Sequence, residues 1–103
     1  MNNDSAGQQA TTMLQDAKGK LLTVTVKSPG QTIFSGWAKA VTSNNEKGLF
    51  DVLPFHANFI SLIRETVIIH QEDNKELKIP LETGIIKVYE DTVHILIGIE
   101  TKS

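Results

Sequence analysis

Short apolar runs alternate with polar residues from Leu21 onward, and turn residues separate these runs at close spacing. In the first run, Leu22, Val24 and Val26 alternate with threonine and lysine, as in a strand with one buried face and one face toward water. Helical periodicity is nowhere convincing. Many short strands with frequent turns favour an all-β sandwich or barrel.

The later runs are also β-prone and end at turn residues. We expect strands over residues 32–42, 49–53, 59–63, 66–71, 77–81, 85–89 and 93–99. Gly36, Ala38 and Ala40 leave little bulk in residues 32–42, which indicates a bend, a bulge or close approach by another backbone. Turns are predicted at residues 28–30, 43–48, 72–75 and 90–91. Residues 1–20 are interpreted as a flexible tail, and residues 21–103 as one β-sandwich domain.

Composition narrows the possible functions. The 103 residues can bury one core but leave little room for a large enclosed active site. A net charge of -2 lacks the positive field that binds nucleic acid. Without cysteine, the chain has no disulfide, no Cys-ligated zinc and no thiol nucleophile. Residues 1–17 contain no lysine or arginine and no apolar run, so we expect no signal peptide, and no later apolar run is long enough to span a membrane.

Residues with chemical potential are few. The spacing of His56, His70 and His94 predicts no metal site, and no motif for a nucleophile or a phosphate-binding loop occurs. We interpret His70 and His94 as surface or hydrogen-bonded residues, whereas His56 follows a strand and is a candidate for contact or catalysis. Trp37 is either a core or sheet-surface residue or an anchor for a partner.

Residues 48–60, GLFDVLPFHANFI, resemble the G-E-[LIF]-G-[IV]-L-P-x-H-A-P-[LF]-[IL] stretch of the epsilon subunit of F-type ATP synthases. Residues 22–29 and 33–36 are similar to that family's opening strand, turn and [VM]-F-x-G segment. Residues 81–88 and 93–96 are similar to its [VL]-S-G-G-[FI]-[LV]-E-V and V-T-V-L segments. The His-Ala-Asn-Phe form at residues 56–59 and the Glu-Thr-Gly form at residues 82–84 look closer to the alternate, sometimes sodium-linked, branch of these ATPases.

The resemblance implies a flattened sandwich of two antiparallel sheets. It also implies a non-catalytic stalk subunit without cofactor or metal, which couples ion translocation to ATP synthesis or hydrolysis. Such a subunit binds gamma and the c-ring, is peripheral at the cytoplasmic face of the membrane, and is monomeric outside the complex. The residues that would face the c-ring are Asn44, Asn45, Glu46, Lys47, Pro54, Phe55 and His56, and those that would bind gamma are Ser28 and Trp37.

Two other functions remain open from the residues alone. A stand-alone β-sandwich module that binds protein or carbohydrate would need, for carbohydrate, a concave cluster of aromatic residues, and the chain has one Trp, one Tyr and four Phe. A small hydrolase or isomerase would need paired ionisable groups that the sequence does not reveal.

Overall fold

The computed structural model describes residues 19–98, and almost all of the predicted tail over residues 1–20 lies outside them. The elements follow in the order β1 (Leu22–Ser28), β2 (Gln31–Ala38), β3 (Ala40–Asn45), β4 (Gly48–Val52), β5 (Phe59–His70), η1 (Glu72–Asn74), β6 (Glu76–Tyr89) and β7 (Thr92–Ile97). Apart from the short 3-10 helix η1, these elements are all strands. The predicted all-β sandwich is confirmed.

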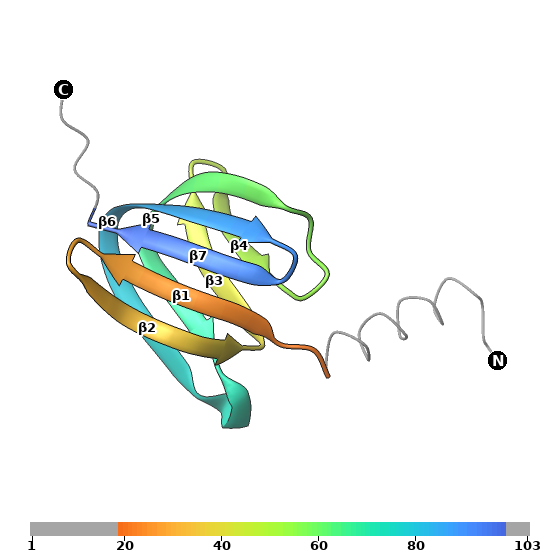
Figure 1. Ribbon diagram of the computed structural model, residues 1–103. Helices are drawn as coiled ribbons and strands as arrows, with labels where there is room; N and C mark the ends of the chain where they lie inside the picture. The colour runs from red at the N-terminus through yellow and green to blue at the C-terminus, as the bar shows by residue number, and fades with distance from the viewer. Residues whose placement is uncertain (1–18, 99–103) are drawn as a thin grey trace.

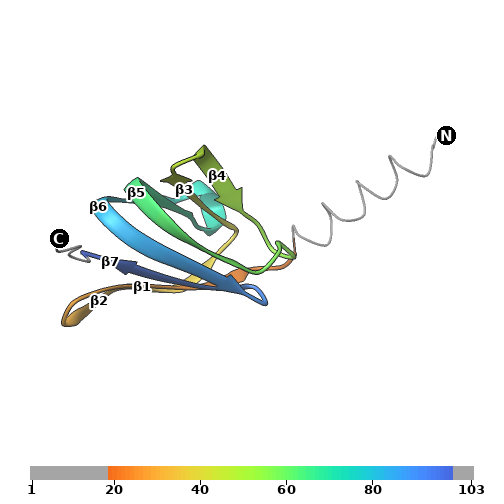
Figure 2. The ribbon, with the colours of Figure 1, turned by 90° about the horizontal axis from the view of Figure 1, so that it is seen from above.

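The strands form one hydrogen-bonded sheet in the order β2-β1-β7-β6-β5-β3-β4, which folds over into two layers (Figures 1 and 2). The long hairpin of β5 and β6 belongs to both layers. Residues 84–89 of β6 pair with β7 in the first layer, while residues 64–70 of β5 pair with β3 in the second. All pairs are antiparallel except β1 with β7, which is parallel. No hairpin joins β1 to β7, so their relative direction is free.

The core lies between the two layers and is almost wholly aliphatic. The predicted alternation in β1 is confirmed, since Leu22, Val24 and Val26 are fully buried. Ser43 is the buried polar residue among residues 19–98, and its hydroxyl donates to the Thr66 carbonyl oxygen at 2.8 Å. The other buried core residues are Ala38, Val41, Val52, Ile63, Val67, Ile69, Ile79, Ile86, Val88, Val93, Ile95 and Ile97.

The prediction of one strand over residues 32–42 is wrong. The chain divides at Lys39 into β2, which pairs with β1, and β3, which pairs with β5 in the other layer. The predicted bulge lies early in β2, where the register shifts opposite Val26 and Lys27. The space above Gly36 is filled by the ring of Phe34, 3.2 Å from an ideal Cβ, and not by another backbone. Residues 32–42 therefore carry the chain from one layer to the other.

The predicted strands 59–63 and 66–71 are one strand, β5, and the predicted strands 77–81 and 85–89 are one strand, β6. The residues between them mark a bend and not an end. The register shifts between Ile63 and Glu65, and Glu65 has a positive φ of 77°. Opposite this bulge, Gly84 allows the Leu96 carbonyl oxygen to approach within 2.8 Å of where a Cβ would stand. This corner of the hairpin takes the sheet from the first layer to the second.

Candidate functional site

The outer face of the first layer carries an unusual number of large apolar side chains. Trp37, Ile60 and Leu62 are 67%, 68% and 65% exposed, and Tyr89 and Leu96 are about half exposed. We call these five residues the apolar face. Cross-strand register places Leu62 and Leu96 on either side of Ile85 in one row. Another row runs from Trp37 through Thr23 and Thr92 to Tyr89, about 14 Å across three strand spacings.

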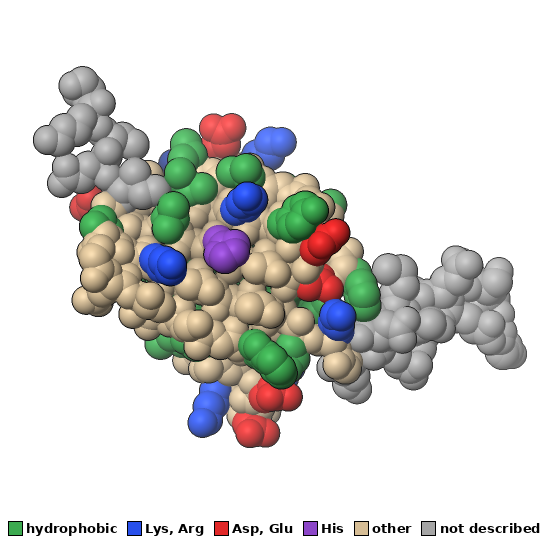
Figure 3. All heavy atoms as spheres, viewed as in Figure 1, with side chains coloured by type: hydrophobic (Ala, Val, Ile, Leu, Met, Phe, Trp, Pro, Cys, Tyr) green, Lys and Arg blue, Asp and Glu red, His purple; other side chains and the backbone are tan. Residues whose placement is uncertain are grey.

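Basic and polar residues separate these apolar side chains. Lys27 lies beside Leu96, and Lys87 lies between Ile60 and His94. Figure 3 shows this side of the molecule, with hydrophobic side chains spread over the sheet and lysine or arginine between them. A sheet that covers a core on one side normally exposes a polar outer face. The apolar face is therefore the described surface best suited to a protein partner.

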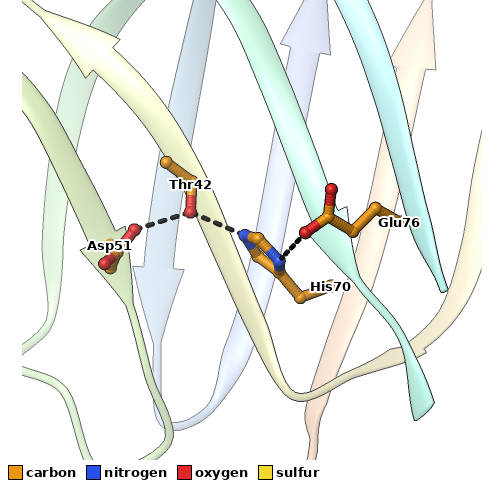
Figure 4. Close-up of polar contacts among 4 residues, drawn as sticks. All are labelled: Thr42, Asp51, His70 and Glu76. Carbon is orange, nitrogen blue, oxygen red and sulfur yellow. Dashed lines mark hydrogen bonds and ion pairs between the residues drawn. The ribbon is translucent and has the colours of Figure 1, made fainter. Parts of the chain in front are cut away.

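The outer face of the second layer is held by polar contacts across four neighbouring strands (Figure 4). The Thr42 hydroxyl donates to Asp51 Oδ1 at 2.6 Å, and its oxygen lies 2.8 Å from His70 Nε2. His70 Nδ1 lies 3.2 Å from Glu76 Oε2. A hydroxyl has one proton, so the Thr42 oxygen accepts from His70 while it donates to Asp51. The contacts tie β4, β3, β5 and β6 together, and they confirm a hydrogen-bonded role for His70.

The same contacts link Thr42, His70 and Glu76 in the order of the nucleophile, base and acid of a catalytic triad. Sequence spacing could not show this, because 28 residues separate Thr42 from His70. Two features oppose catalysis. The Thr42 proton is directed to Asp51 and not to the imidazole, and a carboxylate 2.6 Å away repels both an alkoxide and an oxyanion. The cluster is a structural tie between strands.

The connection between β4 and β5 holds three of the predicted ring-facing residues. Pro54 is buried and anchors the loop, whereas Phe55 and His56 are exposed. The His56 ring lies 5.4 Å from the Phe59 ring, and its Nδ1 lies 3.1 Å from the Ala57 carbonyl oxygen. The structure thus offers the side chains of Phe55 and His56 to a partner, and not that of Pro54.

Two hydrogen bonds fasten this loop to the turn between β6 and β7. The Phe55 N–H donates to Asp91 Oδ1 at 2.8 Å, and the Glu90 N–H donates to Asn58 Oδ1 at 3.0 Å. They hold Phe55 at a positive φ of 68°. Sequence analysis missed the roles of Asn58 and Asp91, although Asx side chains beside turns are known to bind backbone groups.

The turn between β3 and β4 holds the other predicted ring-facing residues. Asn44 and Asn45 are partly buried, while Glu46 and Lys47 are exposed. The Lys47 N–H donates to Asn45 Oδ1 at 2.9 Å, and Asn45 Nδ2 donates to Ser61 Oγ at 3.3 Å. The turn is therefore fixed to β5 by a side chain that sequence analysis assigned to an interface.

The structure does not gather the predicted residues at one spot. Residues 44–47 and residues 54–56 lie at opposite ends of β4, about 14 Å apart along the strand. Trp37 is exposed on the edge strand β2, so its interpretation as a core residue is wrong and the sheet-surface or anchor interpretation is left. Ser28 is half-buried at the far end of the same hairpin. His94 is exposed on β7, as expected of a surface residue.

An open groove of about 630 Å³ lies between the β3–β4 turn and β5. It is lined by Asn45, Glu46, Lys47, Phe59, Ile60, Ser61, Leu62, Ile63, Arg64, Glu82 and Thr83. Phe59 is the aromatic residue of this lining, whereas Trp37 and Tyr89 lie on the open sheet face. The groove therefore lacks the aromatic cluster that a carbohydrate-binding module would need. Among residues 19–98, no His, Asp or Glu side chains gather as a metal site.

No helix in the described part of the chain is long and apolar enough to cross a membrane.

The family model for the ATP synthase Delta/Epsilon chain, beta-sandwich domain, matches residues 21–99. The chain belongs to this family. An ATP synthase epsilon chain from Nitratiruptor is 36% identical over 77 residues, which cover 74% of this chain and 60% of the relative. One from Bordetella petrii is 41% identical over 76 residues, covering 73% and 54%. The chain thus spans little more than half the length of these relatives.

A solved structure supports the fold independently. A chain in the Euglena gracilis mitochondrial ATP synthase, OSCP/F1/c-ring, matches with a TM-score of 0.70 at 18% identity, covering 75% of this chain and 50% of that one. At this identity the likeness concerns the fold alone. Family membership confirms the resemblance identified from the sequence and agrees with a non-catalytic role. The assignment to the sodium-linked branch stays a prediction.

Proposed function

We propose that this chain is a rotor-stalk subunit of an F-type ATP synthase, which binds the gamma subunit through the apolar face and contacts the c-ring through the loops at the ends of β4. It performs no catalysis itself and helps couple ion translocation to ATP synthesis or hydrolysis. It is held at the cytoplasmic face of the membrane through the complex, and outside the complex it is monomeric. Its membership of the Delta/Epsilon family supports this role.

The observation that carries the proposal is the contrast between the two outer faces. Trp37, Ile60 and Leu62 each leave about two thirds of the side chain in water on the first layer. The second layer presents a hydrogen-bonded polar row instead, and on its strands within residues 19–98 Leu49 is the one large exposed apolar side chain. Interface centres are enriched in aromatic and apolar residues and depleted of charge, so gamma is assigned to the first layer.

The ring contact is assigned on different grounds. Glu46, Lys47 and His56 are exposed, and the two loops that carry them are fastened to their neighbours by side-chain hydrogen bonds. Rigid polar loops suit contact with the polar loops of a ring, where charge and hydrogen bonds fix position more than they supply affinity.

Co-expression of the chain with the gamma subunit from the same organism tests the proposal. We expect the two proteins to elute together in size-exclusion chromatography at micromolar concentration. Trp37→Ala should weaken the complex about 30-fold, as for an interface residue that contributes about 2 kcal/mol. Leu49→Ala is the matched control, because Leu49 is 72% exposed but lies on β4, away from the apolar face. Separate elution of the unaltered chain and gamma would refute the proposal.

A further inference from the structure

The groove beside β5 follows the edge of a strand. Its lining includes six consecutive residues, 59–64, whereas a groove over one face of a strand would be lined by alternate residues. On one side these residues pair with β6, from Phe59 with Val88 to Ile63 with Gly84. On the other side, β3 pairs with β5 only from Asn44 and Arg64 onward. Within residues 19–98, the edge of β5 over residues 59–63 has no strand partner.

The β6–β7 turn shows which residues present their backbone groups to this edge. Glu90 and Asp91 both have positive φ, 49° and 63°, as in a two-residue type I′ turn. In such a hairpin the flanking residues, Tyr89 and Thr92, exchange backbone hydrogen bonds with each other. The next residue of β6, Val88, then directs its N–H and C=O toward β5.

Alternation carries this orientation along the hairpin. Backbone groups of every second residue point the same way, so those of Val88, Ile86 and Gly84 all face β5. Their partners on β5 are Phe59, Ser61 and Ile63, which therefore bond to β6. The N–H and C=O groups of Ile60 and Leu62 therefore point into the groove.

A side-chain contact agrees with this orientation. Ser61 Oγ donates to the Leu62 carbonyl oxygen at 3.0 Å, and Asn45 Nδ2 donates in turn to Ser61 Oγ at 3.3 Å. The Leu62 carbonyl thus accepts from the side chain of Ser61, a residue that lines the groove. The two side chains partly cover an edge that no strand covers.

We propose that an extended segment of the gamma subunit adds to this edge as a further strand, bonded to the backbone of Ile60 and Leu62. The inference rests on the proposed function. Ile60 and Leu62 are also members of the apolar face, so a partner seated on that face reaches the groove without a break. A peptide backbone in extended conformation supplies the donors and acceptors that such an edge requires.

Charge further defines the added segment. The groove lining contains two cations, Lys47 and Arg64, and two anions, Glu46 and Glu82. These charges balance, so the groove favours an uncharged segment over an acidic or basic one. The Ile60 and Leu62 side chains lie next to the added strand and favour apolar residues on the side of it that faces gamma.

Two substitutions of Ile60 separate the contribution of its backbone N–H to gamma binding from that of its side chain. Ile60→Pro removes an N–H that faces the groove and leaves the ladder with β6 intact, since proline is tolerated at a strand edge. Ile60→Ala keeps the N–H and removes more of the apolar side chain than proline does, so loss of side-chain contact alone would make the alanine variant the weaker binder. We expect Ile60→Pro to bind gamma about tenfold more weakly than Ile60→Ala, measured by titration with gamma, because an intermolecular hydrogen bond is lost.

Hydrogen exchange in the complete chain gives a second readout that needs no variant. In the free chain, the amides of Ile60 and Leu62 should exchange faster than those of Phe59, Ser61 and Ile63. In the complex with gamma, exchange at Ile60 and Leu62 should slow at least tenfold, with little change at the other three. This result decides the question even if Ile60→Pro does not fold.

The remaining outcomes overturn strand addition in distinguishable ways. Complex formation without slower exchange at Ile60 and Leu62, or equal affinity of the two variants, would refute strand addition and leave the proposed function standing. Slow exchange at these amides in a self-associated chain without gamma would assign the edge to a second copy. Failure of the unaltered chain to bind gamma would refute both proposals.

Discussion

Replacement of Gly84 by alanine tests whether the corner of the β5–β6 hairpin is as closely packed as its geometry indicates. An ideal Cβ on Gly84 would lie 2.7 Å from Leu81 Cδ1, 2.8 Å from the Leu96 carbonyl oxygen and 3.2 Å from Ile63 Cγ1. The Leu81 methyl group can rotate away at little cost. The Leu96 oxygen belongs to β7, which pairs on both sides, and it would have to retreat by 0.6 Å to reach an ordinary contact of 3.4 Å.

Overpacking of this kind costs about 1–3 kcal/mol. The backbone of Gly84 does not have a positive φ, so alanine also reduces the entropy of the unfolded chain and returns about 0.4–1 kcal/mol. At the middle of both ranges, the expected net loss in the free energy of unfolding is about 1.3 kcal/mol, or roughly 5–10 °C in Tm for a domain of this size. Thermal unfolding followed by circular dichroism measures it.

Gly19→Ala is the matched control, because nothing lies within 4 Å of a Cβ there, and its Tm should stay within about 2 °C of the unaltered chain. An unchanged or higher Tm for Gly84→Ala would show that the corner accommodates a methyl group. The close approach of β7 would then not be what requires glycine at the bend.

Three further substitutions test the core and the exposed sites. Trp37→Ala should change the free energy of unfolding by less than about 1 kcal/mol, against about 3–5 kcal/mol for a buried tryptophan, so a large loss in chemical denaturation would contradict its place on the surface. Ser43→Ala should cost about 1–3 kcal/mol, because the part-buried Thr66 carbonyl loses its hydroxyl donor, while the exposed control Ser35→Ala should be neutral within about 0.5 kcal/mol. His56→Ala should keep the Tm and weaken assembly with the c-ring in a pull-down with detergent-solubilised ring; a fall in Tm would indicate a structural role instead.

The alternation of apolar and polar residues predicted which side of β1 is buried. Successive side chains of a strand point to opposite faces, and one face of β1 is exposed to water. The alternation could not distinguish a bend from an end. Residues 64–65 and 82–84 combine polar residues with glycine, as turns do, yet the hairpin continues through them because both strands bend at the same place. At Lys39 the error is the reverse, because a continuous strand was predicted where one strand ends and another begins. Around Lys39 the apolar pattern runs on without a turn signal, while the chain leaves one layer for the other.

The exposure of His56 was predictable from its own segment, whereas its contact with a partner stays a prediction. The exposed His56 follows a strand, as expected, and the resemblance marked its loop. Contacts between distant segments were not predictable. The bond from Phe55 to Asp91 joins residues 36 positions apart, and the Thr42–His70 contact joins residues 28 apart. A single sequence does not show which distant residues meet. Such contacts depend on the order of the strands in the sheet and not on the spacing of residues along the chain.

The positions of the two β4 loops constrain how the proposed partners are arranged. Both loops are fastened in place, and the strand between them lies at one end of the sheet order, whereas β2 with Trp37 lies at the other. A ring that touches both loops must therefore lie along the outer edge of β4, where Leu49 is exposed, and gamma on the apolar face approaches from another side. The apolar face and the β4–β5 loop share no residue, so a substitution at Trp37 should add to a substitution at His56. Glu46 and Lys47 are different, because they line the groove proposed for gamma and also belong to the ring contact. The corner at Gly84 lies where the sheet passes from the layer of the apolar face to the layer that carries β4.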